Sequence, residues 1–189
     1  MNLPNKLTLS RIVMTPIFLF CFLVSFPCHY LVSLVVFAIA SYTDLLDGKI
    51  ARSRNIVTNL GKFMDPIADK MLTTAAFIGL LAIDKMNPWA LFIILLREFV
   101  VTSVRLVAAE NGKVVAANMW GKAKTVAQYI VIIYMIVALQ AAEWFDFGGF
   151  NQFVNVFGQI AIWIAVLMTA ISGILYFWQN RTFFLEGEM

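Results

Sequence analysis

Residues 44–69 read DLLDGKIARSRNIVTNLGKFMDPIAD, and this stretch carries four aspartates in or beside segments apolar enough to span a membrane. The aspartates are Asp44, Asp47, Asp65 and Asp69. Charged side chains at membrane depth are costly, and those that occur there usually serve a functional site. The stretch therefore predicts a polar site enclosed by membrane-spanning helices.

Helical spacing would gather the polar and small residues of this stretch on two stripes. The first stripe consists of Asp44, Asp47, Gly48 and Ala51, with Arg52 one turn beyond Gly48, and the second of Gly61, Asp65 and Asp69. If two such helices pack face to face, the four carboxylates converge and repel one another. Divalent cations would remove that conflict, and all-oxygen ligands suit Mg²⁺ or Mn²⁺.

Three other residues of the stretch favour a ligand in this site. Gly48 and Gly61 leave room for a ligand or for close helix contact, and Arg52 offers a planar fork for phosphate oxygens. The alternative interpretation is a structural network of carboxylates and arginine between helices. It is less favoured, because too few cations lie nearby to neutralise four acids.

The order of these residues resembles the signature of the CDP-alcohol phosphotransferase family. The pattern is Asp, two residues, Asp-Gly, two residues, Ala-Arg, eight residues, Gly, three residues, Asp, three residues, Asp, and it is complete from Asp44 to Asp69. Eight fixed positions at fixed spacing make the match specific. Members are integral membrane enzymes that move a phosphate-bearing group from a CDP-linked donor to an alcohol.

The resemblance implies a role for each motif residue. The four aspartates would hold two divalent cations, and Asp69 would also be the general base that takes the proton of the acceptor hydroxyl. The remaining positions would bind the CDP-linked donor: Thr43, Gly48, Ala51, Arg52 and Gly61. The family is commonly homodimeric, so the resemblance also implies a homodimer.

The composition independently indicates a polytopic membrane protein. The 189 residues are 61% hydrophobic and 13% charged, with a mean hydropathy of +0.84. A soluble domain of this size would not carry so much apolar sequence. The formal net charge is only +3, and the basic residues flank apolar segments instead of forming a basic domain, so nucleic acid is not an expected partner.

We predict an all-α fold: one integral-membrane domain over residues 1–189, with six transmembrane helices preceded by a short interfacial helix. The interfacial helix would cover residues 1–11, the six spans would lie within 12–179, and 180–189 would form a cytoplasmic tail. The expected spans are 12–27, 30–50, 61–83, 89–109, 125–142 and 153–178.

The first eleven residues alternate leucines with polar side chains, which is typical of a helix lying at the membrane surface. A simpler interpretation is a positively charged flank that only orients the first span. The family resemblance implies a further role, in which Asn5, Thr8 and Arg11 close over the nucleotide of the donor.

The distribution of basic residues predicts the orientation in the membrane. Those assigned to the side of the two termini are Lys6, Arg11, Lys49, Arg52, Arg54, Lys62, Lys113, Lys122, Lys124 and Arg181. The loops of the opposite side hold only Lys85 among the basic residues. The positive-inside rule then places both termini and the aspartate site toward the cytoplasm, in a multi-pass protein of the cytoplasmic membrane.

A second polar cluster lies within residues 97–128. Its members are Arg97, Glu98, Arg105, Lys113, Lys122, Lys124 and Gln128. Arg97 and Arg105 share a helix face, whereas Glu98 is expected to point about 100° away from Arg97. The cluster predicts a basic pocket for an acceptor that itself carries phosphate. Alternatively, Arg97 pairs with an acid on another helix and the lysines only orient the protein.

The second cluster resembles the phosphatidylglycerophosphate synthase branch of the family. The matching positions are Arg97-Glu98-Phe99, Ser103, Arg105, Gly112-Lys113, Gly121-Lys122, Lys124-Thr125 and Gln128. This resemblance implies transfer of the phosphatidyl group from CDP-diacylglycerol to glycerol 3-phosphate, which gives phosphatidylglycerol phosphate and CMP. The implied acceptor ligands are Arg97, Arg105, Lys113, Lys122 and Lys124.

Two other functions are compatible with parts of the pattern. A sibling phosphatidyltransferase would keep the donor and the metals but use another acceptor, such as serine or an inositol phosphate. A divalent-cation transporter would also place acids within the membrane. The Gly-x-x-Ala-Arg segment between the acid pairs, the one-sided site and the lack of a paired inverted half all argue against transport.

Overall fold

The structure, a computed structural model, describes residues 3–54, 59–110, 119–145 and 148–180. For residues 3–6, 44–54, 59–66, 69, 109–110, 148 and 150 it describes the course of the helix and not the side chain. The helices are α1 (Leu3–Leu23), α2 (His29–Arg54), α3 (Asn59–Ala82), α4 (Pro88–Glu110), α5 (Met119–Trp144) and α6 (Gly148–Gln179). The described residues contain no strand, which confirms the all-α prediction.

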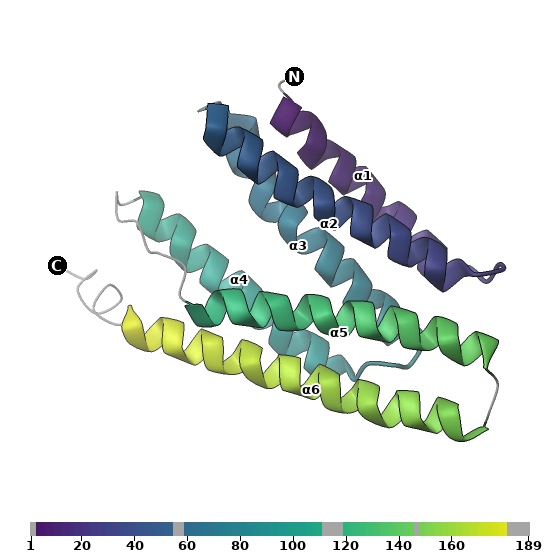
Figure 1. Cartoon of the computed structure of the whole chain (residues 1–189). Coiled ribbons are helices and arrows are strands. Elements are labelled where there is room, and N and C mark those ends of the chain that lie inside the picture. The colour runs from purple at the N-terminus through teal and green to yellow at the C-terminus, as the bar shows by residue number, and fades with distance from the viewer. Residues whose placement is uncertain (1–2, 55–58, 111–118, 146–147, 181–189) are drawn as a thin grey trace.

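Consecutive helices run in opposite directions, so alternate helix ends gather on the same side of the molecule (Figure 1). The start of α1, the end of α2 and the start of α3 lie at one end of the bundle, together with the end of α4, the start of α5 and the end of α6. We call this end the motif end, because the last turns of α2 and the first turns of α3 carry the aspartate motif.

The helices pack as two groups of three. In the first group α1 packs against α2 and α3, and in the second α6 packs against α4 and α5. Contacts of α5 with α2 and α3, and of α4 with α3, join the groups. The larger apolar core cluster of the described residues draws on all six helices, with Phe18, Phe37, Phe77, Ile132 and Ile162 among its buried members.

One glycine allows the close approach of α1 and α3. A Cβ atom added to Gly79 would lie 2.7 Å from Cδ1 of Phe22, well inside van der Waals contact. Phe22 is 1% exposed, so the ring has little room to move away. Because Gly79 has no side chain, α1 and α3 can approach each other closely at this level.

Two described helices are long and apolar enough to cross a membrane, namely Met119–Trp144 and Asn151–Gln179. Shorter apolar segments are Leu7–Leu23, His29–Thr43 and Lys70–Ala82. The helices give the chain the character of a membrane protein, and the six spans remain a prediction.

The outward surface of the bundle is rich in large apolar side chains. Exposed examples occur on each of the six helices: Phe20 on α1, Ile39 on α2, Ile78 on α3, Phe99 on α4, Ile130 on α5 and Leu167 on α6. Soluble monomers rarely expose so much contiguous apolar surface. Lipid is the solvent that such a surface fits.

The predicted division between an interfacial helix at 1–11 and a first span at 12–27 is not marked by a break in the helix, and how each part lies in the membrane stays a prediction. Residues 3–23 form one continuous helix, and Pro16 lies inside it. The polar residues of the first turns suggested a separate element, but polarity alone does not end a helix. The helix ends at Leu23, four residues before Pro27, which disfavours helical conformation in the residue that precedes it.

The other helix limits also differ from the predicted ones. The second helix continues to Arg54, beyond the predicted end at 50, and the third includes Asn59 and Leu60, before the predicted start at 61. The fifth begins at Met119 and the sixth at Gly148, several residues before the predicted spans. Lysine, methionine and alanine are good helix formers in water as well as in lipid. Hydropathy marked where the chain becomes polar, and the helices continue beyond that point.

The turn between α3 and α4 lies at the end opposite the motif end and has clear local determinants. Asp84 adopts a left-handed conformation with φ 57°, and the Lys85 N–H donates to the Leu80 carbonyl over 2.8 Å, as in a Schellman motif. The side-chain oxygen of Asn87 accepts the Trp89 N–H over 2.9 Å. Asn87 therefore caps α4, with Pro88 at the first helical position.

We expect Asn87→Ala to lower the free energy of unfolding by about 1 kcal/mol, because the Trp89 N–H loses its partner. The measurement is thermal unfolding of the detergent-purified protein. Gln152→Ala, a change at an exposed position of α6, is the control and should leave the midpoint unchanged. Equal midpoints for Asn87→Ala and the parent protein would exclude this capping contribution.

Candidate functional site

The residues of the aspartate motif lie on α2 and α3, as the spacing predicted. Asp44, Asp47, Gly48, Ala51 and Arg52 belong to α2, and Gly61, Asp65 and Asp69 belong to α3. The two helices contact each other. The side chains of these eight residues lie outside the described part of the chain, so their ligand roles stay predictions.

The N-terminal residues predicted to bind the donor lie in α1, near the motif end. Thr8 and Arg11 are each 2% exposed, in the helix that packs against both motif-bearing helices. The side chain of Asn5 lies outside the description. The Thr43 hydroxyl donates to the Ala40 carbonyl over 2.7 Å, so its proton is used within α2 and its lone pairs remain for a ligand.

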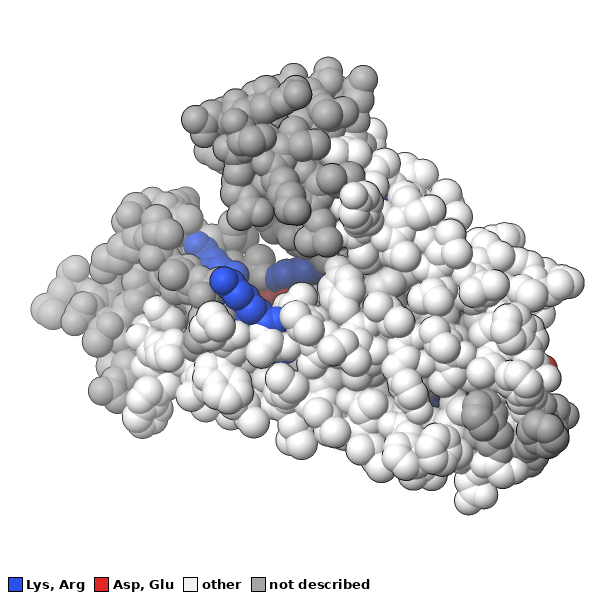
Figure 2. Space-filling model, in the orientation of Figure 1, with Lys and Arg blue, Asp and Glu red and all other residues white. Residues whose placement is uncertain are grey.

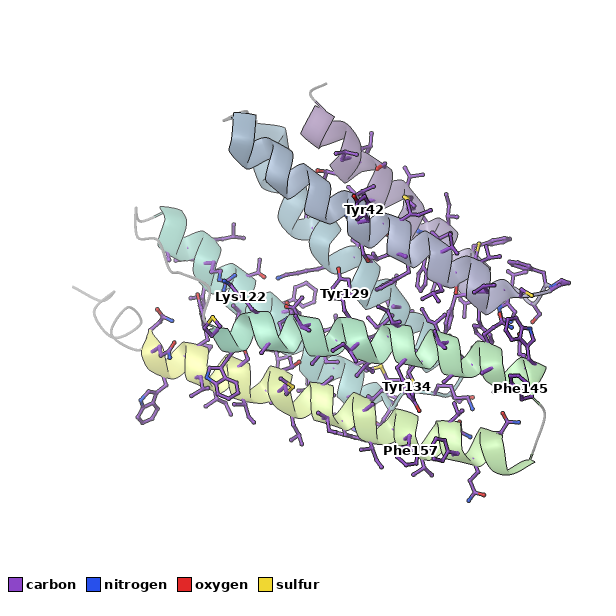
Figure 3. The ribbon with its side chains drawn as sticks, viewed as in Figure 1. Tyr42, Lys122, Tyr129, Tyr134, Phe145 and Phe157 are labelled. Atoms are coloured by element: carbon purple, nitrogen blue, oxygen red, sulfur yellow. The ribbon has the colours of Figure 1, made fainter. Side chains whose placement is uncertain are left out.

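A pocket of about 430 Å³ opens between α3, α4 and α5 at the motif end. We call it the basic pocket. Its lining residues are Lys70, Thr73, Arg97, Glu98, Val101, Thr102, Arg105, Gly121, Lys122, Lys124, Thr125, Val126, Gln128 and Tyr129. Figure 2 shows lysine and arginine side chains gathered in a hollow of the surface, with an acidic side chain behind them. Lys122 and Tyr129 rise from α5 into this space (Figure 3).

The structure brings four of the five predicted acceptor residues to this pocket. Arg97 and Arg105 come from α4, and Lys122 and Lys124 from the first turns of α5. Lys113, the fifth, lies outside the described residues. Four residues that lie up to 27 positions apart in the chain therefore line one pocket, and their role as acceptor ligands stays a prediction.

Glu98 is the single acid among the described lining residues, and three cations surround it. Its carboxylate is ion-paired with Lys124. It also lies 3.4 Å from Nη1 of Arg97 and 3.8 Å from Nζ of Lys70. The Lys70 ammonium donates in addition to the Glu98 backbone carbonyl over 3.0 Å. Glu98 thereby links α3, α4 and α5.

The expectation that Glu98 points away from Arg97 is wrong. Neighbouring positions on a helix diverge by about 100° at Cα, but both side chains are long enough to meet beyond the helix surface. The alternative in which Arg97 pairs with an acid on another helix is also not what the described residues show, because its carboxylate partner is Glu98 of the same helix.

The described lining of the basic pocket offers positive charge and hydrogen-bond donors that suit an anion. This described lining carries one carboxylate and five cations: Lys70, Arg97, Arg105, Lys122 and Lys124. The Nε atoms of Arg97 and Arg105 are buried and have no hydrogen-bond partner among the described residues. Buried donors without partners are costly. An anion such as phosphate would satisfy them.

Comparison with known proteins agrees with this site. The sequence profile of CDP-alcohol phosphatidyltransferases matches residues 1–171. The chain belongs to that family. The match covers the aspartate motif and all of the lining residues of the basic pocket, so the family predicted from the motif is confirmed.

Several bacterial relatives of this CDP-alcohol phosphatidyltransferase carry the name CDP-diacylglycerol–glycerol-3-phosphate 3-phosphatidyltransferase. The protein from Bacillus subtilis (strain 168) is 43% identical, over 95% of each chain. The one from Rickettsia typhi (strain ATCC VR-144 / Wilmington) is 34% identical, over 97% of this chain and 99% of the relative. The one from Pseudomonas fluorescens is 32% identical, over 86% of each chain.

The structure of this phosphatidyltransferase also adds site residues that the sequence did not indicate. Lys70 lines the basic pocket although it was not considered; its signal was a cation directly after Asp69, inside the third predicted span. The sequence assigned no site residue to α6, but the structure does. Ser172 and Tyr176 of α6 contact the two pocket arginines. Serine and tyrosine are common in membrane helices, so no signal marked them.

Proposed function

We propose that this enzyme transfers the phosphatidyl group from CDP-diacylglycerol to glycerol 3-phosphate, releasing CMP and phosphatidylglycerol phosphate. The observation that carries the proposal is the basic pocket, whose described lining holds five cations and one carboxylate, beside the helix that bears Asp65 and Asp69. An acceptor with a phosphate group fits that pocket, and an uncharged alcohol does not. The relatives are named for both substrates.

Members of this family generally depend on divalent metal. The aspartate motif fits such a cofactor, because it offers four carboxylates from two helices in contact and no softer ligand. Asp44, Asp47, Asp65 and Asp69 would hold two Mg²⁺ or Mn²⁺ ions. When bound, these ions would neutralise the diphosphate of the donor and make CMP a better leaving group.

The remaining chemistry belongs to the side chains of the protein. Asp69 takes the proton from the acceptor hydroxyl, whose oxygen attacks the phosphorus attached to diacylglycerol. The bond from that phosphorus to the oxygen of the CMP phosphate breaks, and CMP leaves. Arg52 holds donor phosphates, while Gly48, Ala51 and Gly61 let the nucleotide lie close to α2 and α3.

The basic pocket holds the second substrate during this step. The phosphate of glycerol 3-phosphate is bound by Arg97, Arg105, Lys122, Lys124 and Lys113, the last of which lies outside the described residues. When the phosphate is held at one end of the three-carbon acceptor, the hydroxyl at the other end is oriented toward the donor. The reaction between two bound substrates is then effectively unimolecular. Asn5, Thr8 and Arg11 of α1, with Thr43, complete the donor site.

We also propose the membrane arrangement that the reaction needs. All six helices span the cytoplasmic membrane as one domain, and the motif end faces the cytoplasm, where CMP and glycerol 3-phosphate are soluble. The antiparallel order of the helices supports this arrangement, because it puts the start of α1 and the end of α6 on one side. The homodimer remains a prediction from the family resemblance.

An acceptor panel tests the proposed function. Purified protein with CDP-diacylglycerol and Mg²⁺ or Mn²⁺ is offered glycerol 3-phosphate, serine, inositol or inositol phosphate, and CMP release is measured. We expect release with glycerol 3-phosphate alone, loss of activity with a chelator, and recovery when the metal is returned. Release with another acceptor would favour a sibling enzyme. No release with any acceptor would favour ion transport, which a flux assay would then measure.

A further inference from the structure

We propose that α6 forms the supporting wall of the acceptor site, with Ser172 and Tyr176 as positioning residues for Arg97 and Arg105. This inference rests on the proposed function, in which the two arginines bind the acceptor phosphate. Neither α6 residue lines the basic pocket. Each instead contacts one of the arginines from behind, and so sets the direction in which its guanidinium points.

Ser172 fixes the end of the Arg97 side chain. The Nη2 atom of Arg97 donates to Ser172 Oγ over 2.7 Å, and Ser172 is 1% exposed. The stem of the same arginine lies against the next residue, since a Cβ added to Gly173 would lie 3.0 Å from Cγ of Arg97. The Arg97 side chain is only 9% exposed, so α6 contacts it both along its stem and at its tip.

Tyr176 supports Arg105 in a different way. The Cζ atom of Arg105 lies 5.5 Å from the centroid of the Tyr176 ring, which is within the range of a cation–π contact. The ring is buried against Val101 and Val104 of α4. The Tyr176 hydroxyl is buried and has no hydrogen-bond partner among the described residues, so the aromatic face is the part that acts on the arginine.

The two contacts form a matched pair because α4 and α6 run in the same direction (Figure 1). Arg97 precedes Arg105 on α4, and Ser172 precedes Tyr176 on α6. An arginine side chain free in water has many rotamers, and ordering it on binding reduces affinity. Holding both guanidiniums in advance removes that cost for the acceptor only, since the donor lies on α1, α2 and α3 in the proposed mechanism.

Steady-state kinetics of α6 variants tests the proposal, with KM measured separately for glycerol 3-phosphate and for CDP-diacylglycerol. Ser172→Ala should raise the KM for glycerol 3-phosphate about tenfold, as expected for one lost hydrogen bond to a charged group. Gly173→Ala should raise it as well, because the added methyl displaces the Arg97 stem. The KM for CDP-diacylglycerol should stay at the parent value in both variants.

Two variants at Tyr176 test the contribution of the ring and that of the hydroxyl separately. Tyr176→Leu should raise the KM for glycerol 3-phosphate by a similar factor. Tyr176→Phe keeps the ring and removes only the hydroxyl, so its KM for glycerol 3-phosphate should equal the parent value. Ser33→Ala is the control. Ser33 is also fully buried and donates one hydrogen bond within its own helix, over 2.8 Å to the Tyr30 carbonyl, but it lies near the start of α2, away from the motif end.

Several outcomes would overturn the proposal. An unchanged KM for glycerol 3-phosphate in Ser172→Ala and Tyr176→Leu would do so, and so would equal rises for both substrates or a lower unfolding temperature with unchanged KM values. A raised KM in Tyr176→Phe would overturn the role assigned to the ring. If the parent protein does not use glycerol 3-phosphate, the proposed function itself has failed, which the acceptor panel detects before any variant is made.

Discussion

Asp69→Asn will abolish turnover, with CMP release reduced at least about a hundredfold, the usual contribution of a general base. An amide has nearly the shape of a carboxylate, but it cannot take up the proton of the acceptor hydroxyl. It is also a weaker ligand for a hard divalent cation. The other three aspartates of the motif remain, so binding of the donor should be largely retained.

Two measurements on the same preparation separate chemistry from binding. CMP release reports turnover, and the rise in unfolding temperature on adding CDP with Mg²⁺ reports donor binding. Asp84→Asn is the matched control, because Asp84 is an exposed acid in the turn opposite the motif end and asparagine also tolerates its left-handed backbone. Turnover at the parent rate in Asp69→Asn would remove Asp69 from the mechanism.

Glu98→Gln should give the second-largest effect, a loss of about 3 kcal/mol in the free energy of unfolding. This is the usual cost of removing one partner of a buried ion pair. The carboxylate serves Lys70, Arg97 and Lys124 together, and Lys124 is 5% exposed. Without it the three cations repel one another at short range. Glutamine keeps the size of the side chain, so the change isolates the charge.

This variant carries a second expected signature. Phosphate or glycerol 3-phosphate should raise its unfolding temperature more than that of the parent protein, because the ligand supplies the missing negative charge. Glu143→Gln, which changes a more exposed acid paired with His29 at the other end of the bundle, is the control and should show no such difference. Equal stabilisation of Glu98→Gln and the parent protein by phosphate would contradict the charge-balancing role of Glu98.

The sequence was sufficient to predict the all-α class, the helices that carry the aspartate motif and most of the basic pocket. These features depend on local patterns. Asp65 and Asp69 lie one turn apart on α3 because helical spacing alone dictates it. Arg97 and Arg105 stood out because cations within an apolar span demand an explanation.

The features that the sequence did not predict depend on contacts between distant segments. Ser172 lies 75 positions from Arg97, and only the packing of α6 on α4 makes it a partner. The helix limits were missed for a different reason, since hydropathy marks the edge of an apolar segment and not the end of a hydrogen-bonded helix. Residues 119–124 include two lysines and precede the predicted fifth span, and they are nevertheless helical.

The two groups of three helices have a consequence for recombination between related enzymes. The aspartate motif, the proposed donor site, lies on α2 and α3, with α1 beside them, whereas the basic pocket, the proposed acceptor site, is lined mainly by α4 and α5 and contacted by α6. A chimera joined in the turn after α3 would therefore exchange acceptor preference while keeping the CDP-handling half. Lys70 and Glu98 meet across that junction, so a functional chimera must inherit the two as a compatible pair.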